Sequence, residues 1–308
     1  MLRLFAELVP TLGLGYLIGR RRPSWTRPLA LPLVRFGVPI SLMGLLLRSG
    51  LNWAVLGYAA IAVFGILLML TITQQQRCQA LGLGTPTLQL GSCVGNTAYF
   101  GIPVALALLP EEALPVSIGY DFGATLLAWG LGPLWLARRQ GQKQGEEQAG
   151  TLLSLLRHIS ASPASRGLLG ALMVQLTPWR ADIAALLWFP SRVVIVLALA
   201  VVGMRLGAIE PKGEATASRA GLGASLIAKL AFYPLLMLLV TRLLPLASSS
   251  RDALVLQAAA PTAISVLLMA EAVQREHDTA ALLVLRSTLL ALISVPLWWW
   301  LLQWFGTP

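Results

Sequence analysis

The sequence predicts an all-α polytopic membrane protein with ten transmembrane helices, arranged as two inverted five-helix repeats in which the fourth and ninth helices are broken. Three observations lead to this fold class: the composition, the apolar windows, and a matched pair of breaks in two of those windows. Hydrophobic residues make up 56% of the 308 residues and charged residues 12%, with a mean hydropathy of +0.74. A soluble domain carries about 25% charged residues, so the composition is that of a membrane protein.

Apolar windows recur along the whole chain at the length that a bilayer requires, about 17 to 25 residues. The first window is not read as a cleaved signal peptide, because Glu7 and Pro10 interrupt its core and three arginines follow it. The ten windows lie at about 4–19, 29–48, 51–73, 88–109, 113–136, 164–178, 187–206, 222–244, 252–273 and 280–304.

Positive charges are distributed unevenly between the two sets of connections. One set carries Arg20, Arg21, Arg22, Arg27, Arg77, Arg138, Arg139, Lys143, Arg157, Arg166, Arg205, Lys212, Arg219 and Arg275. The alternate set carries Arg3, Arg48, Arg180 and Arg251. By the positive-inside rule the first set is cytoplasmic, which predicts an integral protein of the cell (inner) membrane with both termini outside the cytoplasm.

A polar stretch rich in Gln, Gly, Lys and Glu divides the ten windows into two groups of five. We expect a first repeat over residues 1–137, a cytoplasmic linker over 138–163, and a second repeat over 164–308. An odd number of spans in each repeat places the second copy upside down relative to the first. Substrates of such transporters bind between the repeats at mid-depth.

The most informative stretch is Gly91 to Leu109, where Gly95-Asn96-Thr97 and then Gly101-Ile102-Pro103 interrupt an apolar run. Lipid cannot accept the backbone groups that such residues free, so the interruption must face protein or a watery cavity. The second half carries a matching proline, Pro261, in its fourth window. The alternative is that both prolines make ordinary kinks, since proline is not rare in transmembrane helices.

Several of these motifs resemble those of one family. The run Asn96 to Pro103 (NTAYFGIP) is similar to the N-T-x-x-x-G-[IL]-P signature of the auxin efflux carrier family of membrane permeases. Weaker similarities follow in order: GLGYLIGR from Gly13, QAAAP from Gln257, and RSTLL from Arg286, leading to Val295-Pro296-Leu297. The resemblance covers nearly the whole chain.

The resemblance implies a fold like that of bile-acid symporters and sodium/proton antiporters, in which the fourth and ninth helices cross near their breaks. Plant members export the carboxylate auxin, and bacterial members are linked to small organic acids such as malate and malonate. The linker here is shorter than thirty residues, which resembles the compact prokaryotic type and argues against a hormone as substrate. Members are often dimers, which makes a homodimer a candidate assembly.

The predicted substrate site lies at the paired breaks. Asn96 and Thr97 offer polar side chains beside a half-helix whose N-terminus attracts anions, although Asn96 could instead cap the severed helix. Gly101 is assigned to close backbone approach and Pro103 to enforcing the break. The predicted substrate-binding residues are Asn96, Thr97, Gly101, Pro103, Pro261, Thr262, Ser265 and Arg286.

Asp121 is the candidate for proton or cation coupling, because it lies about 13 Å into the fifth window at 1.5 Å per residue. A carboxylate at that depth must be paired, protonated or wet. Its alternative role is a structural pair with Arg286, Lys229 or Arg192, and Arg286 could equally attract a substrate carboxylate. Arg192 and Lys229 are placed nearer the ends of their spans, where we expect them to snorkel.

The predicted function is a secondary permease that moves a small organic anion by alternating access, with proton coupling as an option. The alternative is a cation-coupled symporter or antiporter of the bile-acid symporter-like fold, and a membrane sensor is a third. No catalytic constellation, nucleotide-binding loop or Cys/His ligand set occurs in the sequence, so neither an enzyme nor a metal or other cofactor is expected. The basic residues are scattered rather than clustered, which argues against nucleic acid as a partner; the expected partners are the substrate and the lipid bilayer.

Overall fold

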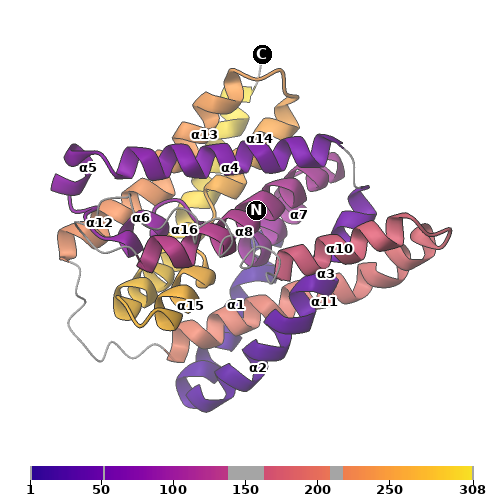
Figure 1. Cartoon of the computed structure of the whole chain (residues 1–308), viewed down its shortest axis with the longest axis horizontal. Coiled ribbons are helices and arrows are strands. Elements are labelled where there is room, and N and C mark those ends of the chain that lie inside the picture. Colours follow the sequence, from indigo (N-terminus) through magenta and orange to yellow (C-terminus); the bar gives the residue numbers. More distant parts are fainter. Residues whose placement is uncertain (1, 51–52, 138–162, 209–217, 307–308) are drawn as a thin grey trace, which may run out of the picture.

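The computed structural model describes residues 2–50, 53–137, 163–208 and 218–306, and these form helices (Figure 1). Pairing of extended backbone among them is confined to one isolated bridge, between Gly95 and Thr262. This confirms the all-helical class. The first half contains α1 (Leu2–Arg21), η1 (Pro23–Trp25), α2 (Thr26–Pro32), η2 (Leu33–Gly37), α3 (Val38–Ser49), α4 (Trp53–Thr73), α5 (Gln76–Ala80), α6 (Pro86–Gly91), η3 (Thr97–Gly101), α7 (Ile102–Leu108), η4 (Glu111–Ala113) and α8 (Leu114–Ala137).

The second half follows the linker, and residues 138–162 of that predicted linker lie outside the described residues. Its first helix, α10, is about 20 Å long at 1.5 Å per residue, which is short for a bilayer core of about 30 Å. The second half contains α10 (Pro163–Gln175), α11 (Arg180–Ala208), α12 (Arg219–Ile227), η5 (Ala228–Phe232), α13 (Tyr233–Arg242), α14 (Ser248–Ala258), α15 (Ile264–Ala272) and α16 (His277–Gly306).

Five continuous helices of the described residues are long and apolar enough to cross a membrane. Two of them join shorter elements end to end through a wide turn, as α12, η5 and α13 do, and three run unbroken, as α4 does. The five are Pro23–Arg48, Trp53–Thr73, Arg180–Ala208, Arg219–Arg242 and His277–Trp304. Each of the ten predicted windows overlaps helical elements, while ten crossings and an inverted repeat stay predictions.

The helices form two bundles. The first bundle consists of α1, α2, α3, α10 and α11, in which α1 packs most extensively on α11 and α3 packs on both α10 and α11. The second bundle consists of α4, α6, α7, α8 and α12 to α16, with α4 packed along α8 and α14 between α8 and α13. Figure 1 shows α1, α2 and α11 in the lower part of the molecule and α4, α13 and α14 in the upper part.

Glycines allow the closest helix contacts in both bundles. A Cβ on Gly15 or Gly19 of α1 would collide with the backbone of Ala200 or Met204 in α11. In the second bundle, Gly123 of α8 lies in the same way against the backbone of α4. Because lipid tails are as apolar as leucine, such close backbone approach is a main source of helix association in membranes.

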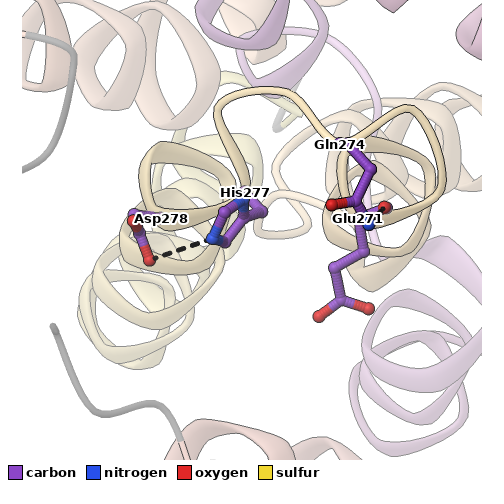
Figure 2. A network of polar contacts seen from close by, with 4 residues as sticks. All are labelled: Glu271, Gln274, His277 and Asp278. Atoms are coloured by element: carbon purple, nitrogen blue, oxygen red, sulfur yellow. Dashed lines mark hydrogen bonds and ion pairs between the residues drawn. The ribbon is translucent and has the colours of Figure 1, made fainter. Parts of the chain in front are cut away.

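A tight turn joins α15 to α16. Gln274 and Glu276 adopt left-handed backbone conformations, with φ of 54° and 48°. The Gln274 side chain donates from Nε2 to the carbonyl oxygen of Glu271 at 3.1 Å. At the start of α16, His277 Nε2 lies 3.6 Å from Asp278 Oδ1 (Figure 2). The turn therefore closes with local contacts, and it carries none of the predicted site residues.

Candidate functional site

Two helices of the second bundle are broken, and their breaks meet. The chain leaves helix after Gly91 and becomes helical again at Thr97, and it leaves helix after Ala258 and becomes helical again at Ile264. The extended residues between these points run antiparallel to one another. The prediction that Pro261 lies opposite the first break is therefore confirmed.

Backbone and side-chain hydrogen bonds hold the two breaks together. The Asn96 N–H donates to the Pro261 carbonyl oxygen at 2.7 Å, and the Ala263 N–H donates to the Val94 carbonyl oxygen at 3.0 Å. Thr262 adds two bonds: its Oγ1 donates to the Gly91 carbonyl oxygen at 2.8 Å, and its N–H donates to Ser287 Oγ at 3.0 Å. Each break thus supplies partners for backbone groups that the other leaves free, as a low-dielectric environment demands.

Pro103 does not mark the break, contrary to expectation. It is the second residue of α7, and the helical segment from Thr97 runs through it. The wide turn of η3 precedes it, in which the Ile102 N–H donates to the carbonyl oxygen of Thr97. A wider turn accommodates a proline because the ring removes a donor and crowds the preceding turn. The break lies instead at Ser92 to Asn96, where the glycine and asparagine are.

Gly101 allows a close approach, as predicted, but the group that lies against it is a side chain of the second half. A Cβ at this position would collide with the amide of Gln257 on α14. Gln257 is buried, and neither its Oε1 nor its Nε2 has a hydrogen-bond partner among the described residues. Gly101 therefore fixes the packing of η3 on α14 rather than lining a cavity.

A cavity of about 110 Å³ opens between the two bundles at the crossing. A buried water needs about 10–15 Å³, so this space admits several waters or a small solute. The second bundle supplies most of the polar wall, and the first bundle supplies a part from α3 and α11 that is apolar except for Ser41. The lining residues are Val38, Ser41, Leu42, Leu45, Gly95, Asn96, Thr97, Ala98, Tyr99, Ile102, Asp121, Thr125, Trp129, Ile195, Ala263, Ile264, Ser265 and Leu268.

Four predicted site residues line this cavity: Asn96, Thr97, Ser265 and Asp121. The Asn96 side chain does not cap the half-helix that follows it, so the alternative structural role does not account for it. Pro261 and Thr262 lie directly behind the wall, where they hold the crossing. The structure therefore gathers six of the predicted residues around one feature.

Asp121 is buried at 3% exposure and faces the cavity from α8. Thr97 Oγ1 donates to its Oδ1 at 2.5 Å, and Thr125 Oγ1 donates to the same oxygen at 3.5 Å. Within the described part of the chain, no Lys or Arg nitrogen comes within 4 Å of this carboxyl group, so the structural ion pair that was the alternative role of Asp121 is absent there. A carboxyl group that has only hydroxyl donors for partners is free to bind a proton or a cation.

The basic residues are not where the sequence placed them. Arg286 is exposed on α16, on the face that carries the exposed Leu289 and Ile293, and it does not line the cavity. Arg192 is exposed on α11 beside the Trp188 ring. Lys229 does not snorkel: its side chain is fully buried, because the helix starts earlier than expected and places this residue in the wide turn η5 at mid-helix.

Sequence reasoning missed several lining residues. Thr125 follows Asp121 by one helical turn, and Trp129 by two, so the i, i+4, i+8 spacing on α8 was the signal that could have identified them. Ser41 on α3 and Tyr99 carried no such signal, since their positions depend on how the bundles meet. The described residues contain no group of three or more metal-binding side chains.

Comparison with known protein families shows which family this chain belongs to. A family model described as a membrane transport protein matches residues 49–299. The chain belongs to the auxin efflux carrier family of membrane transport proteins. A comparison with curated proteins finds no match. The family match covers both broken helices and every cavity residue except those of α3, so this member is an integral membrane transporter rather than one of an enzyme family.

Proposed function

We propose that this transporter moves a small organic carboxylate together with a proton by alternating access, with no enzymatic activity. The observation that carries the proposal is the meeting of two helix N-termini at the cavity. The half-helices Thr97–Leu108 and Ile264–Ala272 both begin in its wall. Such N-termini present free N–H groups and the positive end of the helix dipole, which together favour an anion.

The N–H groups of these first turns support the proposal. Among the described contacts, none gives an acceptor to the N–H of Thr97, Ala98, Ile264 or Ser265. All four residues line the cavity. Unpaired backbone donors in a partly buried wall need a ligand or water to accept from them, and a carboxylate supplies two acceptor oxygens.

The Asp121 carboxyl group argues for a proton in the same step. An ionised Asp121 in the wall would repel a carboxylate substrate at close range, since charges interact strongly where water is excluded. Protonation removes the repulsion. Binding of the substrate anion and of a proton would then favour one another, which is what coupling requires.

Alternating access follows in this proposal from the two bundles. An apolar cluster closes one end of the interface, where Leu45 and Leu46 of α3 pack with Ile118 and Phe122 of α8. The cavity extends the other way, toward Trp129. In the orientation from the charge count, with the protein in the inner membrane and both termini outside, this is the cytoplasmic end. The conformation is then inward-facing, and the second, inverted repeat would support the outward-facing one.

A second candidate is cation-coupled transport, since the one charged side chain among the described cavity residues is acidic. The oxygens of Asp121, Thr97, Thr125 and Ser265 are of the type that binds sodium. Sodium coupling and proton coupling make opposite predictions about which gradient drives uptake.

Purified protein in liposomes tests the proposal. Uptake of labelled malonate, malate and indole-3-acetate is measured with a proton gradient, a sodium gradient or neither. The proposal is supported if at least one carboxylate shows saturable uptake and if an acidic donor side accelerates that uptake. Acceleration by sodium alone selects the second candidate, and absence of saturable uptake of all three under every gradient contradicts both.

A further inference from the structure

Lys229 has the most unusual environment of any charged residue in the described structure. It lies in η5, between α12 and α13, and its side chain has 0% exposure. Among the described residues, only Lys229 and Asp121 are charged side chains that are fully enclosed by protein. Charged side chains inside a membrane domain are costly, and those that occur usually serve a function.

The contacts of Lys229 favour a positive charge. Its Nζ donates to the carbonyl oxygen of Ala258 at 2.6 Å. Ala258 is the last residue of α14, where the helix dipole is negative and carbonyl groups lack helical partners. The Tyr233 ring lies on another side, with its centroid 4.9 Å from Nζ. An aromatic face attracts a cation, so both neighbours favour an ammonium group over an uncharged amine.

The other titratable groups near Lys229 are a thiol and two phenolic hydroxyl groups, which carry no charge when they are protonated. The Cys93 thiol, in the first break, is its electrostatic neighbour. The Tyr233 hydroxyl is hydrogen-bonded to that of Tyr120 at 2.7 Å. In the described structure no carboxylate oxygen comes within 4 Å of Nζ, so the charge is not cancelled by an acidic side chain.

Only backbone separates this amine from the cavity. A Cβ added to Gly95 would lie 3.2 Å from Lys229 Nζ. Gly95 also lines the cavity, next to Asn96 and Thr97. Because Gly95 has no side chain, the amine lies directly behind the wall at the point where the first half-helix begins, and the intervening groups screen its charge poorly.

We propose that Lys229 is the positioning residue that makes the transport site selective for a negatively charged substrate. It acts across Gly95, without contact, on a carboxylate held by the N–H groups at the crossing. With Asp121 protonated, the site carries the single positive charge of Lys229, which one substrate carboxylate neutralises. The inference rests on the proposed carboxylate transport.

The environments of two arginines in membrane helices differ from that of Lys229. Arg192 and Arg286 lie on outward faces of α11 and α16 and do not line the cavity. Their charges lie on the outside of the protein, away from the cavity, whereas that of Lys229 is enclosed. Arg192 therefore serves as the matched control: it is a cation in a membrane helix, and removing it leaves the crossing unchanged.

The test compares Lys229→Gln, which keeps an N–H donor for Ala258 but removes the charge, with Arg192→Gln. Uptake of labelled indole-3-acetate and of malonate is measured in proteoliposomes, and each is competed with its uncharged amide, indole-3-acetamide or malonamide. We expect Lys229→Gln to raise the half-saturating concentration of the carboxylate about ten-fold or more while inhibition by the amide stays unchanged. Arg192→Gln should match the wild type in both.

Two further results complete the test. If Lys229→Gln does not fold, Lys229→Arg and Lys229→Met replace it, and only the arginine variant should keep the preference for carboxylate over amide. Equal loss of carboxylate and amide affinity in the uncharged variants indicates a purely structural role and overturns the inference. An unchanged ratio in Lys229→Gln also overturns it, while wild-type protein without carboxylate uptake contradicts the proposed function itself.

Discussion

Thr97 and Asp121 join the first broken helix to α8 through one short hydrogen bond, with Thr97 Oγ1 2.5 Å from Asp121 Oδ1. Both residues are almost fully enclosed and both line the cavity. The half-helix that begins at Thr97 is therefore tied to the carboxyl group proposed to carry the proton. A change in the protonation of Asp121 acts directly on the first residue after the break.

Replacing Asp121 with Asn removes the titrating group and keeps an oxygen that accepts from Thr97 and Thr125. We expect Asp121→Asn to abolish the acceleration of carboxylate uptake by an acidic donor side, because no proton can then be bound or released at this position. Counterflow exchange of labelled for unlabelled substrate, which needs no net proton movement, should persist. Initial uptake rates between pH 5 and 8 check this, and an unchanged pH profile would reduce Asp121 to a structural role.

Gly15 gives a sharp test of the contact between α1 and α11. A Cβ there meets the backbone of Ala200, which cannot move aside as a side chain can. We expect Gly15→Ala to lower the free energy of unfolding by about 1–3 kcal/mol, since overpacking forces the backbones apart. Thermal unfolding in detergent measures the change.

The control for that prediction is Gly13, two residues earlier on the same helix, where an added Cβ meets nothing within 4 Å. Gly13→Ala should leave stability unchanged or raise it by up to about 1 kcal/mol through helix propensity. Equal effects of the two substitutions would show that the close approach of α1 to α11 contributes nothing to stability.

Gly101 and Gln257 should behave as a coupled pair. An alanine at 101 collides with the end of the Gln257 side chain, whose amide has no hydrogen-bond partner among the described residues. We expect Gly101→Ala alone to destabilise the protein and Gln257→Ala to relieve most of that cost in the double variant. A double-mutant cycle in detergent should give an interaction energy of about 1 kcal/mol or more, and additive effects would contradict the packing described.

Tyr120 and Tyr233 form a buried hydroxyl pair that joins α8 to α13 at 2.7 Å. Tyr120→Phe leaves the Tyr233 hydroxyl without this partner, at an expected cost of about 1–3 kcal/mol. The double variant Tyr120→Phe/Tyr233→Phe should cost less than the sum of the single variants, because no orphaned hydroxyl remains. Chemical unfolding of the wild type, the two single variants and the double variant measures these costs. If the cost of the double variant equals the sum of the two single costs, the hydrogen bond makes no net contribution to stability.

The sequence predicted those features that depend on local chemistry. The glycine and asparagine at 95 and 96 cannot continue a lipid-exposed helix, and Pro261 supplies the matching interruption, so the pairing of the breaks was within reach of sequence reasoning. Depth along a helix is also local, which is why Asp121 could be selected. Each of these residues is at the crossing.

Features that depend on which face of a helix meets a neighbour could not be predicted in the same way. Arg286 was chosen for its charge, but α16 is apolar on both faces, and only Ser287 and Thr288 indicate the buried one. Lys229 was misplaced because its helix begins at Arg219, which puts it about 15 Å along the axis. Its burial depends on the position of α14, and the sequence of the helix that carries Lys229 does not encode that position.

The hydrogen bonds between Asn96 and Pro261 and between Val94 and Ala263 also bear on how the protein is made. Synthesis delivers residues 94–96 to the bilayer long before residues 261–263. Until the later segment arrives, the earlier one has backbone groups without their final partners, and hydrocarbon cannot supply them. The first break must therefore wait, shielded by water, lipid headgroups or the insertion machinery, and it receives its partners only when the ninth window arrives.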